Sequence, residues 1–245
     1  MEKEVWQSET LKILAYIDEV LTSKGLWYSL AYGSLLGAVR ENGFIPWDRD
    51  ADIIIKLPER DLVRKVLKEN LPAGMIYIDS SVDNSFCYDN IASTKYYDVF
   101  VDVFALYGAP EIDKLTDKEI AKILKRNKFC VKVFGAKYGK IHLLTNKNKV
   151  VPYLIVKVIM HFIPNGFIRK LIRRIEFKIN YDEAKYCMTM ATYRRSKDIM
   201  PKELFDKTIR HKFCDIELNI LVEHHAYLTR SYGEDYMIPK QTGWQ

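Results

Sequence analysis

Carboxylates at the start of a buried strand constrain the fold of this chain more than any other feature. Asp50 and Asp52 alternate just before three isoleucines, residues 53–55. The aliphatic run is typical of a buried strand, and residues two apart on a strand point to the same face. A charge at that depth is costly unless a cation or another group compensates it. The alternative, an acidic loop whose aspartates cap turns, accounts poorly for Asp52. The sequence therefore predicts a strand that begins at a metal-binding cleft.

The composition fits a folded protein with a sizeable core. The chain has 245 residues, 48% of them hydrophobic, and a net charge of +6. These values exclude a disordered polycation, a collagen-like repeat and a disulfide-knotted miniprotein, and they favour one large domain or one domain with an appended lobe. The N-terminus has no apolar secretion segment, and the four cysteines form no Cys-x-x-Cys pair. We therefore expect a cytoplasmic protein with reduced thiols.

Strand patterns and helix patterns occupy largely separate parts of the chain. Apolar spacing and turn residues predict helices at 8–24, 35–40 and 59–70 and strands at 26–32, 51–57, 75–79, 86–92 and 98–106. From residue 113 the chain becomes helical and basic, with a strand pair and a short helix in 201–220 and a further helix at 221–230. This segregation predicts an α+β fold rather than a regular βαβ alternation.

A later strand supplies a third buried carboxylate. Asp98 and Asp102 lie four residues apart, so both face one side of the strand, and Asp102 has apolar neighbours on both flanks. One interpretation is a lone buried aspartate satisfied by backbone donors. The other is a cleft in which two strands contribute three carboxylates, as metal-assisted phosphoryl or nucleotidyl transfer requires.

The dipeptide Gly33-Ser34 follows a predicted strand and precedes a predicted helix. Exposed backbone N–H groups at a helix start favour phosphate, and a glycine allows phosphate to approach closely. The signal is weak alone, because most Gly-Ser dipeptides form turns. Its value comes from the Asp-x-Asp pattern that follows on the next predicted strand.

These residues together resemble the LicD family of the nucleotidyltransferase-fold superfamily. The motif is GSLLGAVRENGFIPWDRDADI, from Gly33 to residue 53. Two further segments are similar to family elements, FVDVFAL at 100–106 and YLTRSYGEDYMIP at 227–239. Matching pieces span about residues 8–239, with a poorly matched middle at 110–195.

The resemblance implies both a fold and a reaction. The fold would be nucleotidyltransferase-like: a mixed β-sheet flanked by helices, with a helical C-terminal lobe. Residues 1–110 would form the catalytic core, and residues 111–245 a mostly helical lobe packed with it as one unit. The reaction would move a phospho-alcohol, such as phosphocholine, from a CDP-linked donor to a sugar hydroxyl of a glycan or lipid-linked glycan. Such a step belongs to lipopolysaccharide, teichoic acid or capsule synthesis.

The family motif assigns roles to the three carboxylates. Asp50 and Asp52 would bind Mg²⁺, with Mn²⁺ as the alternative, and Asp102 would be the third ligand or the general base. Gly33 and Ser34 would cradle a donor phosphate.

Five further residues become candidates for substrate binding by the same resemblance. Arg40 would neutralise a phosphate, with Lys95 as a weaker candidate. Trp47 would stack on a base or line a choline pocket, or else serve as a hydrophobic plug. Asp48 would orient the loop or a metal-bound water. Arg49 stands where the family often has an acid, which weakens the case for choline because a nearby cation repels a trimethylammonium group.

Residues 150–175 predict a membrane-surface segment. The apolar run at 150–164 is too short and too polar to cross a bilayer, and the following helix places four cations beside an apolar face. The alternative is an ordinary amphipathic helix packed on the core. With the +6 charge, we expect an anionic membrane surface at the inner face of the membrane as partner rather than nucleic acid, because the basic stretch at 114–149 lacks interleaved aromatic residues.

Two rival functions remain open. One is a nucleotidyltransferase that adds NMP from an NTP to a small molecule or an RNA end. The other is a non-catalytic, membrane-associated partner with a decayed active site.

Overall fold

A curled sheet organises the chain in the computed structural model, which describes residues 2–80, 87–96, 98–138, 150–193 and 195–239. Its strands lie in the order β1 (Tyr28–Leu30), β2 (Asp52–Lys56), β5 (Phe100–Ala109), β4 (Asp89–Ser93) and β3 (Met75–Ile78). The pairing of β2 with β5 is parallel, and the other pairs in this order are antiparallel. The C-terminal end of β5 also pairs with β6 (Tyr186–Met188), which pairs with β7 (Met200–Pro201).

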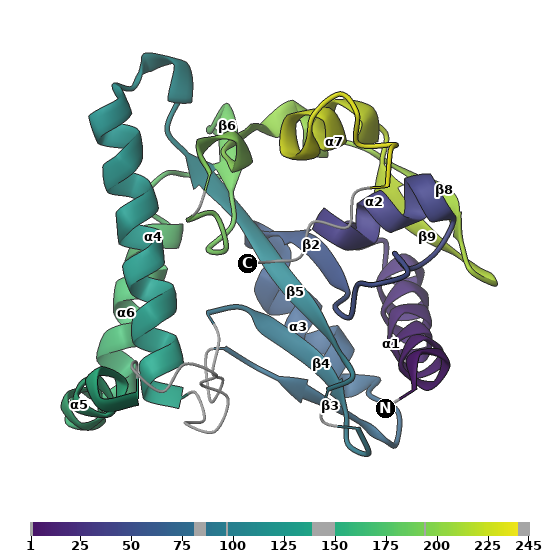
Figure 1. Ribbon diagram of the computed structural model, residues 1–245, viewed down its shortest axis with the longest axis horizontal. Coiled ribbons are helices and arrows are strands. Elements are labelled where there is room, and N and C mark those ends of the chain that lie inside the picture. The colour runs from purple at the N-terminus through teal and green to yellow at the C-terminus, as the bar shows by residue number, and fades with distance from the viewer. Residues whose placement is uncertain (1, 81–86, 97, 139–149, 194, 240–245) are drawn as a thin grey trace.

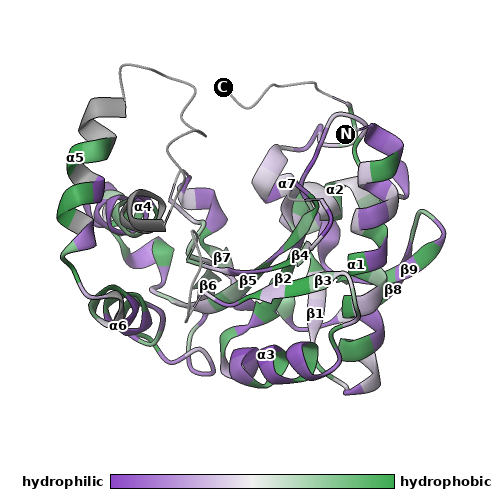
Figure 2. Ribbon diagram, turned by 90° about the horizontal axis from the view of Figure 1, so that it is seen from below, coloured by the Kyte–Doolittle hydropathy of each residue, from purple (hydrophilic) through white to green (hydrophobic). Residues whose placement is uncertain are grey.

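Helices flank this sheet on both faces and at both sides. The α-helices are α1 (Lys3–Ser23), α2 (Tyr32–Glu41), α3 (Arg60–Glu69), α4 (Asp117–Tyr138), α5 (Val150–His161), α6 (Asn165–Glu176) and α7 (His224–Tyr232). Short 3₁₀ helices are η1 (Leu57–Glu59), η2 (Ile112–Lys114), η5 (Ser196–Asp198) and η6 (Lys202–Phe205). In Figure 1, α4, α5 and α6 lie on one side of β5 and α1 on the other. Figure 2 shows α3 on one face of the sheet and α2 with α7 on the opposite face.

The mixed α+β prediction is confirmed, and two details differ from the sequence patterns. The first helix begins at Lys3 rather than residue 8. The reason is that Trp6 is buried against Phe44, with ring centroids 5.2 Å apart, so packing extends the helix towards the N-terminus. Residues after 110 supply four strands as well as helices. The predicted strand pair is the hairpin β8 (Thr208–Phe213) and β9 (Ile216–Leu221), and β9 lies against β1 and α1.

The basic helix α6 buries the face that was expected to meet a membrane. Ile168, Ile172 and Ile175 are at most 8% exposed and pack with Tyr107 of β5 and Cys130 of α4. The interfacial interpretation of this face is therefore wrong, and the alternative of an amphipathic helix packed on the core describes it. This burial removes apolar area from water, which stabilises the fold by about 25 cal/mol per Å².

Exposed apolar residues gather instead on α5 and the turn that follows it. They are Leu154, Ile155, Val158, Ile159 and Phe162, and Figure 2 shows α5 as the outermost helix on its side. None of the helices in the described part of the chain combines the length and the apolar character that a bilayer crossing needs. Residues 139–149 of the expected basic stretch lie outside the described residues.

A close backbone approach holds α2 against the loop that leads to the carboxylates. A Cβ on Gly37 would lie 2.4 Å from the carbonyl oxygen of Gly43 and 3.2 Å from the backbone nitrogen of Ile45. The Gly43 N–H donates to the Gly37 carbonyl at 3.2 Å, which fixes the same contact. Any side chain at residue 37 would have to push this backbone away.

We predict that Gly37→Ala lowers the free energy of unfolding by about 1–3 kcal/mol, because the added methyl overpacks a contact made of backbone. Urea denaturation followed by circular dichroism measures this. Gly166→Ala is the matched control: it also lies in a helix, and its Cβ would meet nothing within 4 Å. That variant should be neutral or stabilised by up to about 1 kcal/mol. Equal effects at the two positions would contradict the close approach.

Candidate active site

Three adjacent strands place polar side chains in one row across the sheet. Asp52 is the register partner of Asp102 in the parallel pair β2–β5, and Asn90 of β4 is the register partner of Asp102 on its other side. Residues in register point to the same face, so the three side chains lie together. Asp52 and Asp102 are 6% and 8% exposed, and the Asn90 amide donates a hydrogen bond to Asp102. The sequence-predicted pairing of two strand carboxylates is thus a consequence of strand register.

The loop before β2 adds two more carboxylates to this group. Removal of solvent by the surrounding protein, together with a hydrogen bond to Asp48 and the charge of Asp48, raises the pKa of Asp50 to about 7. Burial raises the pKa of Asp52 well above its usual value, and the charges of Asp50, Asp102 and Asp48 add to this shift. Burial and the charge of Asp50 likewise raise the pKa of Asp102. The four acids therefore repel one another, and either protons or a cation would relieve this repulsion.

The carboxylate oxygens of this group are ligands that suit a divalent cation, although no three of these side chains lie close enough together to hold one. Mg²⁺ prefers carboxylate oxygens and usually takes one or two from protein together with phosphate oxygens. Within the described ranges of the chain, no three His, Cys, Asp or Glu side chains are close enough together to hold a metal ion. Metal binding by Asp50, Asp52 and Asp102 therefore stays a prediction.

Gly33 and Ser34, at the start of α2, contact the residues that carry the carboxylates. The backbone N–H of Asp52 donates to the Ser34 Oγ at 2.9 Å, so this buried hydroxyl fixes the first residue of β2. A Cβ on Gly33 would lie 2.5 Å from the Asp48 Oδ2, so the glycine makes room for that carboxylate. Tyr32, just before them, has a φ of +46°, a conformation that costs energy for a non-glycine residue. In this structure the dipeptide shapes the acidic loop.

Arg40 and Trp47 lie together beside the acidic loop. The Arg40 guanidinium bonds the Glu41 carboxylate at 2.8 Å and the Tyr236 carbonyl at 3.2 Å. Its centre lies 5.9 Å from the centroid of the Trp47 ring, and Trp47 is 42% exposed. The arginine thus tethers the C-terminal segment and lies beside the Trp47 ring, which stays partly exposed to solvent.

The other two predicted cations differ in their distance from the carboxylates. Arg49 is exposed in the acidic loop, and its backbone N–H donates to the Asp48 Oδ1 at 3.0 Å. Lys95 lies exposed on the turn between β4 and β5, with its Nζ 4.8 Å from the Tyr96 ring centroid and Glu9 of α1 as its nearest acidic influence. In the structure, Arg49 lies beside the carboxylates, whereas Lys95 lies at the turn of the β4–β5 hairpin.

Several residues near the carboxylates escaped the sequence analysis. Loss of solvent raises the pKa of Tyr232 of α7, the charges of Asp52 and Asp48 add to this shift, and Arg195 opposes it, so the arginine lies on the same side of the sheet. Arg195 is held at 3.0 Å by Asp198 and donates to the Ser231 carbonyl. A signal for Tyr232 was present, because it belongs to the C-terminal Tyr-Gly element. Arg195 had no local signal, since only the tertiary fold brings it there.

Another missed residue, Tyr88, borders the carboxylates from the other strand edge. Its ring packs on Phe104 with centroids 4.3 Å apart, and the charges of Asp102 and Asp52 contribute to its raised pKa after burial. Asn90, two residues later, was also missed. The sequence shows a polar residue inside a predicted strand, but it does not show which side chain that residue would bind.

We predict that Ser34→Ala destabilises the protein by about 1–3 kcal/mol, because the buried N–H of Asp52 would lose its acceptor. Chemical denaturation measures the change. Ser8→Ala, at an exposed position of α1, is the control and should stay within about 0.5 kcal/mol of the parent protein. If Ser34→Ala were as mild as the control, the hydroxyl would not be the anchor of β2.

Comparison with known proteins gives two matches. Residues 25–135 match the family model described as LicD/FKTN/FKRP, nucleotidyltransferase domain, and this range contains both strand carboxylates and the whole acidic loop. The chain is also 25% identical over 248 residues to the lipopolysaccharide cholinephosphotransferase LicD of Haemophilus influenzae (strain Rd). That alignment covers 94% of this chain and 90% of the relative. The chain is therefore similar to the LicD family over residues 25–135, and to this relative over most of its length.

Proposed function

We propose that this chain transfers a phospho-alcohol group, phosphocholine or a similar one, to a sugar hydroxyl of a cell-surface glycan precursor. A CDP-linked alcohol would be the donor and CMP the leaving group. The observation that carries the proposal is the buried pair Asp52–Asp102, aligned by strand register inside the segment that matches the family model. The LicD relative, a lipopolysaccharide cholinephosphotransferase, supports the transferred group and the class of acceptor.

The carboxylates have separate roles in this proposal. Asp50, Asp52 and Asp102 would hold Mg²⁺, which would neutralise charge on the donor phosphates. Asp102 is oriented by the Asn90 amide and is the candidate to take the proton of the attacking sugar hydroxyl. The sugar oxygen would then form a bond to the phosphorus that carries the alcohol, the bond from that phosphorus to the bridging oxygen would break, and CMP would leave with that oxygen.

The cations around the loop bear on which alcohol is accepted. Arg40 already lies against the Trp47 ring, and Arg49 adds a second guanidinium to the same loop. A trimethylammonium group that bound at Trp47 would meet like charge on one side. Donors with uncharged alcohols, CDP-ribitol and CDP-glycerol, therefore belong in the assay beside CDP-choline and CDP-ethanolamine.

The proposed acceptor would bring the enzyme to a membrane. A lipid-linked glycan would be met at the inner face, and the exposed apolar side chains of α5 lie on the outer side of the molecule next to the basic helix α6. This arrangement supports a peripheral position through α5, in place of the buried apolar face of α6.

We predict that Asp52→Asn and Asp102→Asn each lower kcat for CMP release about 10²-fold to 10⁴-fold, because each removes a carboxylate from the reacting group. The assay uses each CDP-alcohol with Mg²⁺ and a glycan acceptor. Asp117→Asn, at the exposed start of α4, is the control and should keep its activity. Undiminished turnover in either site variant would contradict the mechanism. Pyrophosphate release from an NTP would favour the nucleotidyltransferase alternative.

A second prediction concerns the metal itself. Mg²⁺ at 100 times its dissociation constant should stabilise the parent protein by about 2.7 kcal/mol, because the cation binds only the folded carboxylate group. Asp52→Asn should be more stable than the parent protein in EDTA, since a buried like charge is removed, and it should gain less from Mg²⁺. Thermal unfolding with and without Mg²⁺ measures both effects. A parent protein that melts at one temperature under both conditions would refute the metal site.

A further inference from the structure

A long stretch of the chain contains no acidic residue. Residues 120–175 include fourteen lysines and arginines and neither aspartate nor glutamate. The whole chain has 38 basic and 32 acidic residues, so acids outnumber basic residues everywhere else taken together. This basic stretch, residues 120–175, includes most of α4, all of α5 and all but the last residue of α6. The positive net charge of the protein therefore comes from this one stretch.

The helix α5 and the turn after it carry a row of exposed apolar side chains. The row follows a spacing of one, three and four residues, which places its members along one side of a helix. Each is between 39% and 79% exposed: Leu154, Ile155, Val158, Ile159 and Phe162. Figures 1 and 2 both show α5 at the outer edge of the helices, away from the sheet. The row is thus available to a partner that removes it from water.

The exposed side of α6 combines an aromatic residue with cations. Phe167, Lys170 and Arg174 follow one another at intervals of three and four residues, so they share one side of the helix, and all three are exposed. Within the part of the chain that the structure describes, neither Lys170 nor Arg174 makes an ion pair or a hydrogen bond through its side chain. These two cations are therefore available to an external anion.

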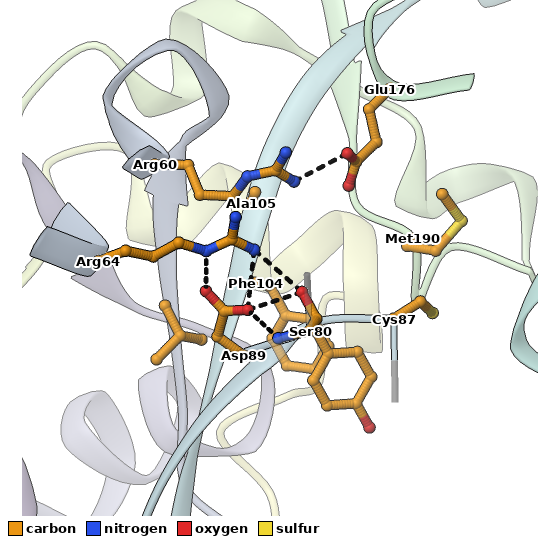
Figure 3. Close-up of a pocket in the computed structure, with 11 residues that line it drawn as sticks. Arg60, Arg64, Ser80, Cys87, Asp89, Phe104, Ala105, Glu176 and Met190 are labelled. Atoms are coloured by element: carbon orange, nitrogen blue, oxygen red, sulfur yellow. Dashed lines mark hydrogen bonds and ion pairs between the residues drawn. The ribbon is translucent and has the colours of Figure 1, made fainter. Parts of the chain in front are cut away.

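The cations between α6 and the sheet are used within the fold instead. Figure 3 shows Arg60 of α3 paired with Glu176 of α6, and Arg64 of α3 paired with Asp89 of β4. The shortest distances between their nitrogen and oxygen atoms are 2.8 Å and 2.7 Å. All four residues are buried, so an external partner does not reach these pairs. Attraction for an anionic partner is therefore left to the cations on the outer side of α6.

The lack of acids in the basic stretch argues against a second copy of this chain as the partner. A two-fold interface brings the same patch of both copies together, so two positive stretches would face and repel each other. Nucleic acid offers phosphate groups but no apolar layer for the aliphatic side chains of α5. An anionic lipid bilayer offers both, because its headgroups attract cations and its acyl chains take up apolar side chains.

We propose that α5 and the outer side of α6 bind the surface of an anionic lipid bilayer. The apolar row of α5 and Phe167 enter the boundary between headgroups and acyl chains, while Lys170 and Arg174 contact lipid phosphates. Each cation near such a surface strengthens binding about fivefold, so neither the apolar row nor the cations alone suffice. The proposal specifies the lipid charge for a peripheral position of the protein. It does not depend on the transfer reaction, because none of these residues belongs to the candidate active site.

Co-sedimentation of the full-length chain with lipid vesicles tests the proposal. The vesicles consist of phosphatidylcholine alone or of phosphatidylcholine with phosphatidylglycerol. Ile155→Ser with Ile159→Ser shortens the apolar row. Leu62→Ser with Ile209→Ser is the matched control, since these two aliphatic side chains are also exposed but lie on α3 and β8.

A second pair of double variants tests the charge. Lys170→Gln with Arg174→Gln removes the two cations of α6, and Lys24→Gln with Lys212→Gln removes two exposed cations outside the basic stretch. Thermal melts establish that every variant is folded. CMP release with a water-soluble glycan acceptor reports on the transfer reaction separately.

The parent protein should bind the anionic vesicles at least about tenfold more tightly than phosphatidylcholine alone, and added salt should weaken this binding because it screens exposed charges. Both surface variants should bind the anionic vesicles at least about tenfold more weakly than the parent protein, whereas both control variants should stay within about twofold. Each surface variant should keep the CMP release of the parent protein with the soluble acceptor, so loss of docking and loss of catalysis are distinct results.

Four results would overturn the proposal. The parent protein could fail to bind anionic vesicles, which would favour an acidic protein as partner, or it could bind both vesicle compositions equally. Equal losses in the surface and control variants would show diffuse attraction to charge. Full binding by Ile155→Ser with Ile159→Ser would show that the apolar row does not enter the bilayer. Dimers in analytical ultracentrifugation that this variant dissociates would assign the row to a second copy of the chain.

Discussion

The parallel pairing of β2 with β5 is the constraint on which the candidate site depends. It sets Asp52 beside Asp102 in the middle of a sheet, where each carboxylate is desolvated and repelled by the other. Such an arrangement costs stability in the absence of a cation and has no packing advantage over apolar residues. The surrounding contacts hold it in place: Ser34 fixes the start of β2, Asn90 binds Asp102, and Gly33 leaves space for Asp48.

Sequence patterns identified the carboxylates because burial and charge conflict visibly at those positions. Asp52 before three isoleucines and Asp102 inside an apolar strand each signal a group that needs compensation. The roles of other residues depended on tertiary contacts that a linear pattern does not contain. Ser34 was expected to face phosphate and instead accepts from a backbone N–H, while Arg195 reaches the carboxylate side of the sheet from a segment about 90 residues after Asp102.

The amphipathic helix α6 illustrates the same limit in another way. Its apolar stripe fits a membrane surface and a protein core equally well, since both remove apolar groups from water. The fold decides the matter, because α4 and β5 present a complementary apolar surface to Ile168, Ile172 and Ile175. The two faces of the sheet also carry different polar groups. Asp52 and Asp102 lie on one face, and the ion pair of Arg64 with Asp89 lies on the other, so the net charge of +6 describes neither.

The packing of Phe44 shows that the segment matched by the family model depends on residues outside it. Its ring lies between Trp6 of α1, at 5.2 Å, and Phe213 of the β8–β9 hairpin, at 4.8 Å. The loop that carries the carboxylates is therefore clamped between the beginning of the chain and a hairpin about 170 residues further on. The family model covers residues 25–135, whereas aromatic packing joins both ends of the chain to this segment. A fragment cut at the borders of that match would keep the aspartates and lose the two aromatic residues that hold their loop in place.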